Sequence, residues 1–175
     1  NASAKASVNQ SMILQKNLAG DKGVAASNET KVAFLLNIIE PLIVNDLNNE
    51  LAIQNDILEI LVTLLKTQDT IALKSSGSAS SIKPYTKFAL RCVTSAIRTE
   101  PALARFYQIE GGVAKVLDLL QHMPDQEQVA NAVKIVRICL RDDIIYDKMA
   151  VAYGPVLGNL LVDRMRQWNM SQPII

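Results

Sequence analysis

The chain has 175 residues, of which 49% are hydrophobic, 20% charged and only 5% aromatic. This length fits one domain with a substantial core, and the excess of aliphatic residues over aromatics, glycine and proline favours stacked helices over a sheet sandwich. A net charge of +1 excludes the basic field over the whole surface that a dedicated nucleic-acid binder carries, and no apolar run approaches the ~20 residues that cross a bilayer.

Two cysteines, Cys92 and Cys139, each lie within an apolar helical pattern. This favours buried thiols in a reducing compartment. We therefore expect a cytoplasmic protein, with nuclear or cytoskeleton-associated locations as alternatives. Because the chain begins with Asn1 rather than Met, we also expect it to be part of a longer protein.

Residues 1–27 mix Ala, Ser, Asn, Lys and Gly, which predicts a flexible or weakly helical segment. Ser27 or Asn28 can cap a helix that follows. Pro41 either kinks this helix or starts a new one, and the sequence leaves both open. The helix presents one apolar face at helical spacing, formed by Val32, Leu35, Leu36, Ile39, Leu42 and Ile43.

A turn or cap at residues 46–49 precedes a helix whose apolar positions run from Ile53 to Leu65. Residues 68–83 then lose periodicity and include a low-complexity Ser-rich run, which cannot bury enough apolar surface to offset its ordering entropy. We expect a mobile surface loop there. Another long helix begins at Pro84 or Tyr85.

The most informative stretch runs from Thr99 to Arg141. A short helix that begins at Glu100-Pro101 ends at Gly111-Gly112, a second apolar helix ends near Gln121, and a turn at residues 122–125 precedes a long third helix. After this unit, the sequence predicts a helix from Asp142 to Tyr153, a break at Gly154-Pro155 and a last helix over 156–168.

The helical segments repeat along the chain. Residues 89–99 overlay residues 132–142 at an offset of 43, and a further copy that begins at Leu35 precedes them by 54 residues. Segments 57–65, 114–120 and 156–161 also align, at offsets of 55 and 41. The Ser-rich loop accounts for the longer spacing. A period of about 41–43 residues falls in the range of armadillo and HEAT arrays.

Residues 109–120 follow the order of helix, glycine break and apolar helix ending in two leucines, which resembles the armadillo repeat. The resemblance implies an all-α, right-handed superhelix of about three to four degenerate three-helix repeats. Residues 28–170 would form one such domain with the Ser-rich loop at 68–83, followed by a tail at 171–175. An irregular helical bundle without true repeats is the alternative.

In this family the third helix of each repeat lines a concave groove that binds extended peptides or partner proteins. On the helix over 127–140, one stripe must be core, and at ~100° per residue the polar positions fall opposite to it. Stacked helices lie 8–10 Å apart, so Arg91 should neighbour Lys134, and Arg98 should neighbour Arg141. The candidate partner-binding residues on this side are Asn37, Arg91, Ser95, Arg98, Asn131, Lys134, Arg137, Ile138 and Arg141.

These positions predict a basic ladder that suits an acidic or phosphorylated partner segment, whereas an ordinary solvated helix face is the plain alternative. The importin-like branch of the family clamps peptides with Trp and Asn four residues apart. The matching positions here hold Arg91 and Ser95, Lys134 and Ile138, and Asn37 and Pro41, so that mode of binding is disfavoured. The basic lining is more similar to that of catenin-type armadillo proteins.

We find no constellation of residues that predicts catalysis, a metal site or a cofactor. His122, the only histidine, lies in a turn and is expected to be a solvated surface group. Asp142, Asp143 and Asp147 form an acidic cluster at a helix start, where they would stabilise the helix dipole. We therefore expect a protein that is not an enzyme.

Two functions remain in competition. The first is a protein-interaction module, an armadillo-like scaffold fragment that binds an extended or helical, acidic partner segment on its concave face. The second is a structural element that assembles through the ends of the solenoid, with Trp168 and the terminal isoleucines as exposed apolar groups. Binding to nucleic acid or anionic lipid is disfavoured by the net charge.

Overall fold

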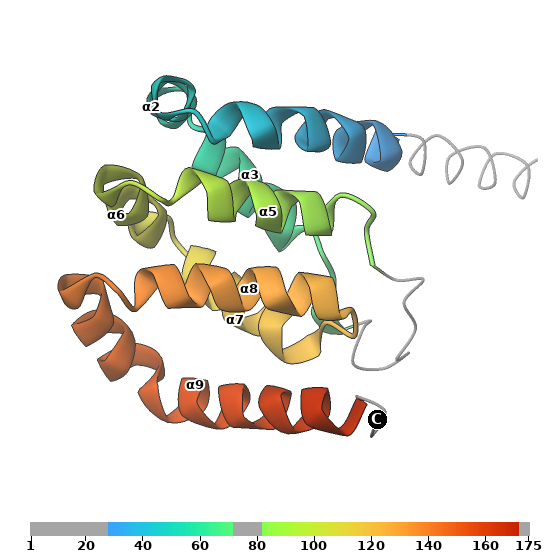
Figure 1. Cartoon of the computed structure of the whole chain (residues 1–175), viewed down its shortest axis with the longest axis vertical. Coiled ribbons are helices and arrows are strands. Elements are labelled where there is room, and N and C mark those ends of the chain that lie inside the picture. Colours follow the sequence, from blue (N-terminus) through green and yellow to red (C-terminus); the bar gives the residue numbers. More distant parts are fainter. Residues whose placement is uncertain (1–27, 72–81, 172–175) are drawn as a thin grey trace, which may run out of the picture.

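The computed structural model describes residues 28–71 and 82–171, with side chains up to residue 166. All regular structure in these ranges is helical, which confirms the all-α class. Residues 1–27, most of the predicted Ser-rich loop and the last four residues lie outside the described ranges. A helix over residues 28–43 precedes α2 (Asp46–Gln54), α3 (Ile57–Lys66), α5 (Thr86–Ala96), α6 (Glu100–Gln108), α7 (Gly112–His122), α8 (Gln126–Cys139) and α9 (Asp143–Ser171) (Figure 1).

The helix over residues 28–43 runs through Pro41 without a break, so no new helix begins there. Proline has no N–H to donate to the carbonyl four residues earlier, which belongs to Asn37. Both residues are exposed, so water can reach that carbonyl. The loss of one hydrogen bond is therefore tolerated on the solvent side of the helix.

The predicted apolar face of this first helix is only half buried. Leu36 and Ile43 are 4% and 2% exposed, as expected, but Leu35 and Leu42 are 55% and 54% exposed. Ala33, which lies outside the predicted set, is buried instead. Among the described residues, this helix has a packing neighbour on one side only, and the sequence pattern does not show which side that is.

The single helix predicted from Ile53 to Leu65 is wrong, because α2 and α3 are separate. The side chain of Asn45 accepts hydrogen bonds from two backbone N–H groups at the start of α2. At the other end, Asp56 has a φ of 58°, in the left-handed region through which a right-handed helix cannot continue. Figure 1 shows α2 almost end-on and α3 running in another direction.

The three-helix unit predicted between Thr99 and Arg141 is confirmed as α6, α7 and α8. Pro101 lies in the first turn of α6, where its missing N–H removes no helical hydrogen bond. Gly111 has a φ of +70°, a conformation that favours glycine, and this reverses the chain between α6 and α7. Asp125 caps α8 by accepting a 2.7 Å hydrogen bond from the N–H of Glu127.

The break predicted at Gly154-Pro155 is also wrong. The helix α9 continues from Asp143 to Ser171 with Pro155 inside it. Figure 1 shows that α9 changes direction part of the way along its length. A proline removes one backbone hydrogen bond and crowds the preceding turn, which bends a helix without necessarily ending it.

Helices at equivalent positions of the predicted repeat pack on one another. Helix α5 packs on α8, α3 packs on α7, and α7 packs on α9. Within each unit, α5 also packs on α3 and α8 on α7. The helix over 28–43, α5 and α8 therefore lie side by side in one layer, here called the front layer, with α3 and α7 behind it (Figure 1).

Aliphatic side chains fill the space between the front layer and the helices behind it. Each fully buried leucine or isoleucine contributes roughly 2 kcal/mol relative to an exposed one, so this continuous core holds the units together. The side chains with no exposed surface include Leu58, Leu61, Leu65, Leu90, Val93, Ile97, Leu119 and Leu120.

The ends of the aperiodic stretch at 68–83 belong to the core, which corrects the prediction of a surface loop at these ends. Gln68 is 1% exposed, and its side-chain oxygen accepts hydrogen bonds from the N–H of Lys83 and the hydroxyl of Thr86, at 2.8 and 3.0 Å. The hydroxyls of Thr67 and Tyr85 lie 2.6 Å apart. Residues 72–81 thus join two anchored ends and themselves lie outside the described ranges.

Candidate functional site

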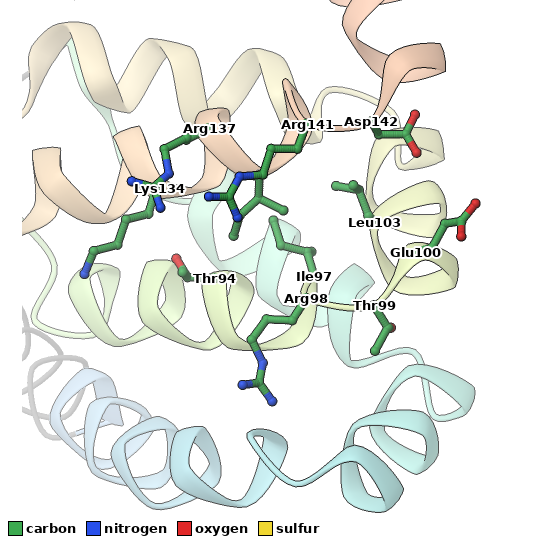
Figure 2. Close-up of a pocket in the computed structure, with 11 residues that line it drawn as sticks. Thr94, Ile97, Arg98, Thr99, Glu100, Leu103, Lys134, Arg137, Arg141 and Asp142 are labelled. Atoms are coloured by element: carbon green, nitrogen blue, oxygen red, sulfur yellow. The ribbon is translucent and has the colours of Figure 1, made fainter.

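The hollow that holds most of the predicted basic residues lies between the carboxyl-terminal ends of α5 and α8 and the start of α6. Its volume is about 660 Å³. Figure 2 shows that residues from α5, α6, α8 and the turns that follow α5 and α8 meet around it. This surface is called the α5–α8 groove below. Its lining residues are Thr94, Ile97, Arg98, Thr99, Glu100, Leu103, Lys134, Arg137, Ile138, Arg141 and Asp142.

The floor of the α5–α8 groove is apolar. Ile97 at the end of α5 is fully buried, Leu103 on α6 is 6% exposed, and Ile138 on α8 is partly buried. These side chains belong to the core or pack against it, so their positions are fixed without a ligand. A partner side chain placed here would meet preformed apolar surface.

Three cations surround this floor, namely Lys134, Arg137 and Arg141. All three are exposed. Within the described parts of the chain, no carboxylate pairs with any of them, whereas ion pairs are present elsewhere in the same ranges. Positive charge is therefore left uncompensated at one place on the front layer.

Arg91 on α5 and Arg98 in the turn after it are in a different state. The guanidinium of Arg91 lies 2.6 Å from the carboxylate of Glu40 on the preceding helix. Arg98 donates to the carbonyl oxygens of Val44 and Ser95 and lies 3.8 Å from Asp46. Arg98 still lines the groove, whereas Arg91 does not. The predicted basic ladder is therefore present in the sequence, but in the structure Arg91 and Arg98 have internal partners.

The two carboxylates at the rim lie at the starts of helices. Asp142 accepts a 2.9 Å hydrogen bond from the N–H of Ile145 in the first turn of α9. Glu100 is in the first turn of α6, and Figure 2 shows its side chain pointing away from Arg141. Both positions favour negative charge through the helix dipole. In the described ranges, neither carboxylate lies within 4.0 Å of a charged nitrogen of the three cations.

The groove brings together five of the nine predicted residues, which are Arg98, Lys134, Arg137, Ile138 and Arg141. The other four lie elsewhere. Asn37 is exposed on the first helix, Arg91 pairs with Glu40, and Ser95 is half-buried with its carbonyl accepting from Arg98 and from the amide of Asn49.

Asn131 was predicted to be exposed, and this is wrong, because it is 6% exposed. The prediction treated α8 as a helix with one buried face and one free face. In a stack, a helix of the front layer is covered by the helix behind it and by its neighbours in the layer. Consequently, fewer residues of α8 are exposed than the residues that lie opposite its core stripe.

Sequence reasoning missed the apolar floor. Leu103 lies in the short helix predicted from Glu100-Pro101 and Ile97 in the helix predicted from Pro84 or Tyr85, but neither was predicted as a binding residue, and both line the groove. An apolar residue at the end of a helix is a weak signal, because the same residue type fills the core. The one usable hint was Ile138, an isoleucine among the otherwise polar positions of the predicted outer stripe.

A second hollow, of about 620 Å³, lies between α2 and the start of α6. Asn49 lines it and is 1% exposed, and its amide nitrogen donates to the carbonyls of Ile43, Ser95 and Ala96. These bonds fasten α2 to the end of α5. The side chain serves packing between units, and the charged residues that line the hollow are two carboxylates, Asp46 and Glu50.

His122 is not the solvated group that the sequence predicted. Its side chain is 11% exposed, and Nδ1 lies 3.1 Å from the carboxylate of Asp118. Burial alone would raise the pKa of Asp118, but hydrogen bonds from Thr70 and Lys115 and the charges of Lys115 and His122 outweigh it and lower that pKa. This polar cluster joins α7 to the start of the aperiodic stretch.

Burial raises the pKa of both thiols to about 12, with the charge of Glu40 adding to the effect at Cys92 and that of Asp142 at Cys139. Both cysteines are free and buried, as predicted. Thiols in this state are protonated and unreactive at neutral pH. In the described ranges, no group of three or more His, Cys, Asp or Glu side chains is arranged to hold a metal ion.

A scan against protein-family models finds no match to this chain. Searches of curated proteins and of solved structures find no similar protein either. None of the helices in the described part of the chain is both long and apolar enough to span a membrane.

Proposed function

We propose that this chain is a non-enzymatic protein-interaction module of the armadillo type, and that the α5–α8 groove binds an acidic segment of a partner protein. The observation that carries the proposal is the set of three cations, Lys134, Arg137 and Arg141, which surround an apolar floor and have no ion-pair partner in the described parts of the chain. The stacking of α3 on α7 and of α5 on α8 supports the armadillo-like arrangement.

The charges favour an acidic ligand on energetic grounds. Like charges in one groove repel one another in the free protein, modestly because water screens them. A carboxylate that enters the groove relieves this repulsion and forms charge-assisted hydrogen bonds, each worth up to about 1 kcal/mol at these exposed side chains. Since no internal carboxylate occupies these donors within the described ranges, the ligand does not have to displace one.

The apolar floor narrows the class of ligand further. Ile138 and the small exposed part of Leu103 offer a place for one aliphatic or aromatic side chain between the cations, whereas Ile97 lies beneath them with no exposed surface. We therefore expect a segment in which an apolar residue is flanked by Asp or Glu. The volume of about 660 Å³ suits a few residues of an extended peptide rather than a whole domain.

A selection experiment tests this function. A library of random 12-residue peptides is selected for binding to the full chain, and the affinities of the enriched peptides are measured by fluorescence anisotropy. We expect enrichment of an apolar residue next to Asp or Glu. The double variant Lys134→Glu/Arg137→Glu should bind these peptides at least about tenfold more weakly, because two charge-assisted contacts become repulsive.

The matched control is Lys31→Glu, which makes the same change of charge per site at an exposed lysine outside the groove. It should leave affinity unchanged within about twofold at 0.15 M salt, where charges further apart than ~8 Å are largely screened. Enriched peptides without acidic residues, or equal binding by the double variant, would remove the basis of the proposed function.

A further inference from the structure

The helix over residues 28–43 carries a stripe of large apolar side chains that are exposed. Phe34, Leu35, Ile38 and Leu42 are 65%, 55%, 45% and 54% exposed. Their spacing places them along one side of the helix. This surface is called the N-terminal stripe. Exposed apolar residues are ordinary when scattered, but a contiguous group marks a contact surface.

The internal repeat shows what kind of contact this is. At the offset of 54 residues, Leu35, Ile38 and Leu42 correspond to positions on α5 that have no exposed surface, and the further offset of 43 leads to positions on α8 that are 1% exposed. The equivalent residues are Ala89, Cys92 and Ala96 on α5, and Ala132, Ile135 and Cys139 on α8.

The contacts of α5 identify the neighbour that covers these positions. The thiol of Cys92 lies 3.4 Å from the carbonyl of Leu36 on the preceding helix of the front layer. The carbonyl of Ala96 accepts a 3.0 Å hydrogen bond from Asn49 in the preceding unit. This side of a front-layer helix therefore faces the unit before it. The N-terminal stripe is the same side, without a neighbour among the described residues.

The opposite end of the stack lacks a front-layer helix. Leu90 and Ile97 on α5 are fully buried, but their equivalents on α8, Val133 and Leu140, are only partly buried. No helix within the described ranges follows α8 in the front layer. The side of α8 that would meet the next helix is therefore open.

The second part of α9 forms the other wall of this open place. By sequence offset it corresponds to α3 and α7, each of which packs against a helix of the front layer, α5 or α8. Gly154 and Gly158 of α9 have open space where a side chain would begin, with no described atom within 4 Å. The space between α8 and α9 is called the C-terminal recess.

We propose that this chain associates head to tail, with the first helix of a second copy seated in the C-terminal recess. Within the described ranges, the recess lacks a front-layer helix and the helix over 28–43 lacks a preceding unit. The stacking would continue the α5–α8 interface already present within the chain. The stripe would meet the open side of α8, where Val133 and Leu140 are only partly buried, and the adjoining side of the same helix would lie against the small residues of α9.

The two surfaces differ from each other, so the contact is heterologous and each copy keeps one free end. The association therefore produces chains of variable length rather than a closed dimer. This inference is independent of the groove function, because it uses neither Lys134 nor Arg141. It extends the end-to-end alternative raised by the sequence, for which the predicted groups at Trp168 and the terminal isoleucines lie outside the described side chains.

Sedimentation velocity of the full chain over a wide concentration range provides the test. The weight-average mass should rise steadily above the 19.2 kDa of one chain and pass twice that value. The stripe variant Ile38→Asp/Leu42→Asp and the recess variant Gly158→Trp should each remain at one chain. Ile60→Asp is the control, since Ile60 is 52% exposed on α3 at neither end, and it should behave as the unchanged chain.

Mixing the two variants gives the sharpest result. Each keeps one intact surface, so an equimolar mixture should form complexes of two chains and no larger species. Circular dichroism checks that the variants fold, and Gly158→Arg replaces the tryptophan variant if that one does not. A single-chain mass at every concentration would overturn the proposal and assign the stripe to residues 1–27 or to another partner. Normal association of the recess variant would overturn it in favour of stripe-to-stripe pairing.

Discussion

Helices α5 and α8, together with the turns that follow them, carry basic residues at equivalent positions, yet within the described ranges only Lys134 and Arg141 lack an internal contact. Arg91 pairs with Glu40 at 2.6 Å, and Arg98 donates to the carbonyl of Val44. Their equivalents on α8, Lys134 and Arg141, have no such contact in the described parts of the chain.

The difference comes from the neighbouring helix and not from the basic residues themselves. At the repeat offset, the residue on α5 that corresponds to Glu40 is Thr94, which carries no charge. Figure 2 shows Thr94 beside Lys134 at the edge of the groove. A row of cations therefore indicates a binding surface only where the adjacent unit does not supply acidic residues that pair with them.

The largest expected effect concerns the reactivity of the buried cysteines, which should be equally low on α5 and α8. Burial raises the pKa of Cys92 and Cys139 to about 12. A thiol pKa of about 12 in place of 9.0 lowers the fraction of thiolate at pH 8 by about 1,000-fold. Both cysteines of the folded chain should therefore resist iodoacetamide, and mass spectrometry should show rapid alkylation only in denaturant.

The same shifts make folding stability depend on pH. A thiol whose pKa is higher in the folded state holds its proton more tightly there, so its contribution is complete below the unfolded value of 9.0 and declines as pH rises toward about 12. Urea unfolding from pH 8 to 10.5 should show this decline.

In the alkylation experiment, faster labelling of Cys139 than of Cys92 would mean that the stack opens at the α8 end.

A smaller effect should separate the two sets of cations. Arg91→Glu replaces an ion pair with two facing carboxylates, and we expect the free energy of unfolding to fall by about 1 kcal/mol. Lys134→Glu breaks no described contact and should change it by less than about 0.5 kcal/mol. Thermal melts of the two single variants make the comparison. Equal melting temperatures would show that the Arg91 pair adds nothing to stability.

The smallest effect on stability is expected when Lys134 is given an acidic neighbour like the one that Glu40 provides for Arg91. Thr94→Glu places a carboxylate where Glu40 stands in the preceding unit, within reach of Lys134. An exposed pair of this kind should change the free energy of unfolding by no more than about 0.5 kcal/mol. The affinity for acidic peptides should nevertheless fall several-fold, because the ligand now has to displace an internal carboxylate. Thr94→Gln, which has similar size and no charge, is the control.

The elements of the fold were largely predictable because short-range chemistry sets them. The helical period of apolar residues, the proline at the start of α6 and the left-handed glycine after it each act within a few residues. The predictions of helix ends failed where a residue behaved differently from what is usual for its type. Asp56 adopts a left-handed conformation without being glycine, and Pro155 bends α9 without ending it.

The sequence by itself determined the helical class, the three helices between Thr99 and Arg141 and the positions of the basic residues along the helices. Only the tertiary structure decided which apolar residues stay exposed, that Asn131 is covered, and that Arg91 is neutralised while Lys134 is not. Helical periodicity depends on neighbours three or four residues away. Burial and ion pairing in a stack depend on a helix some 50 residues away, whose register and charges no local pattern encodes.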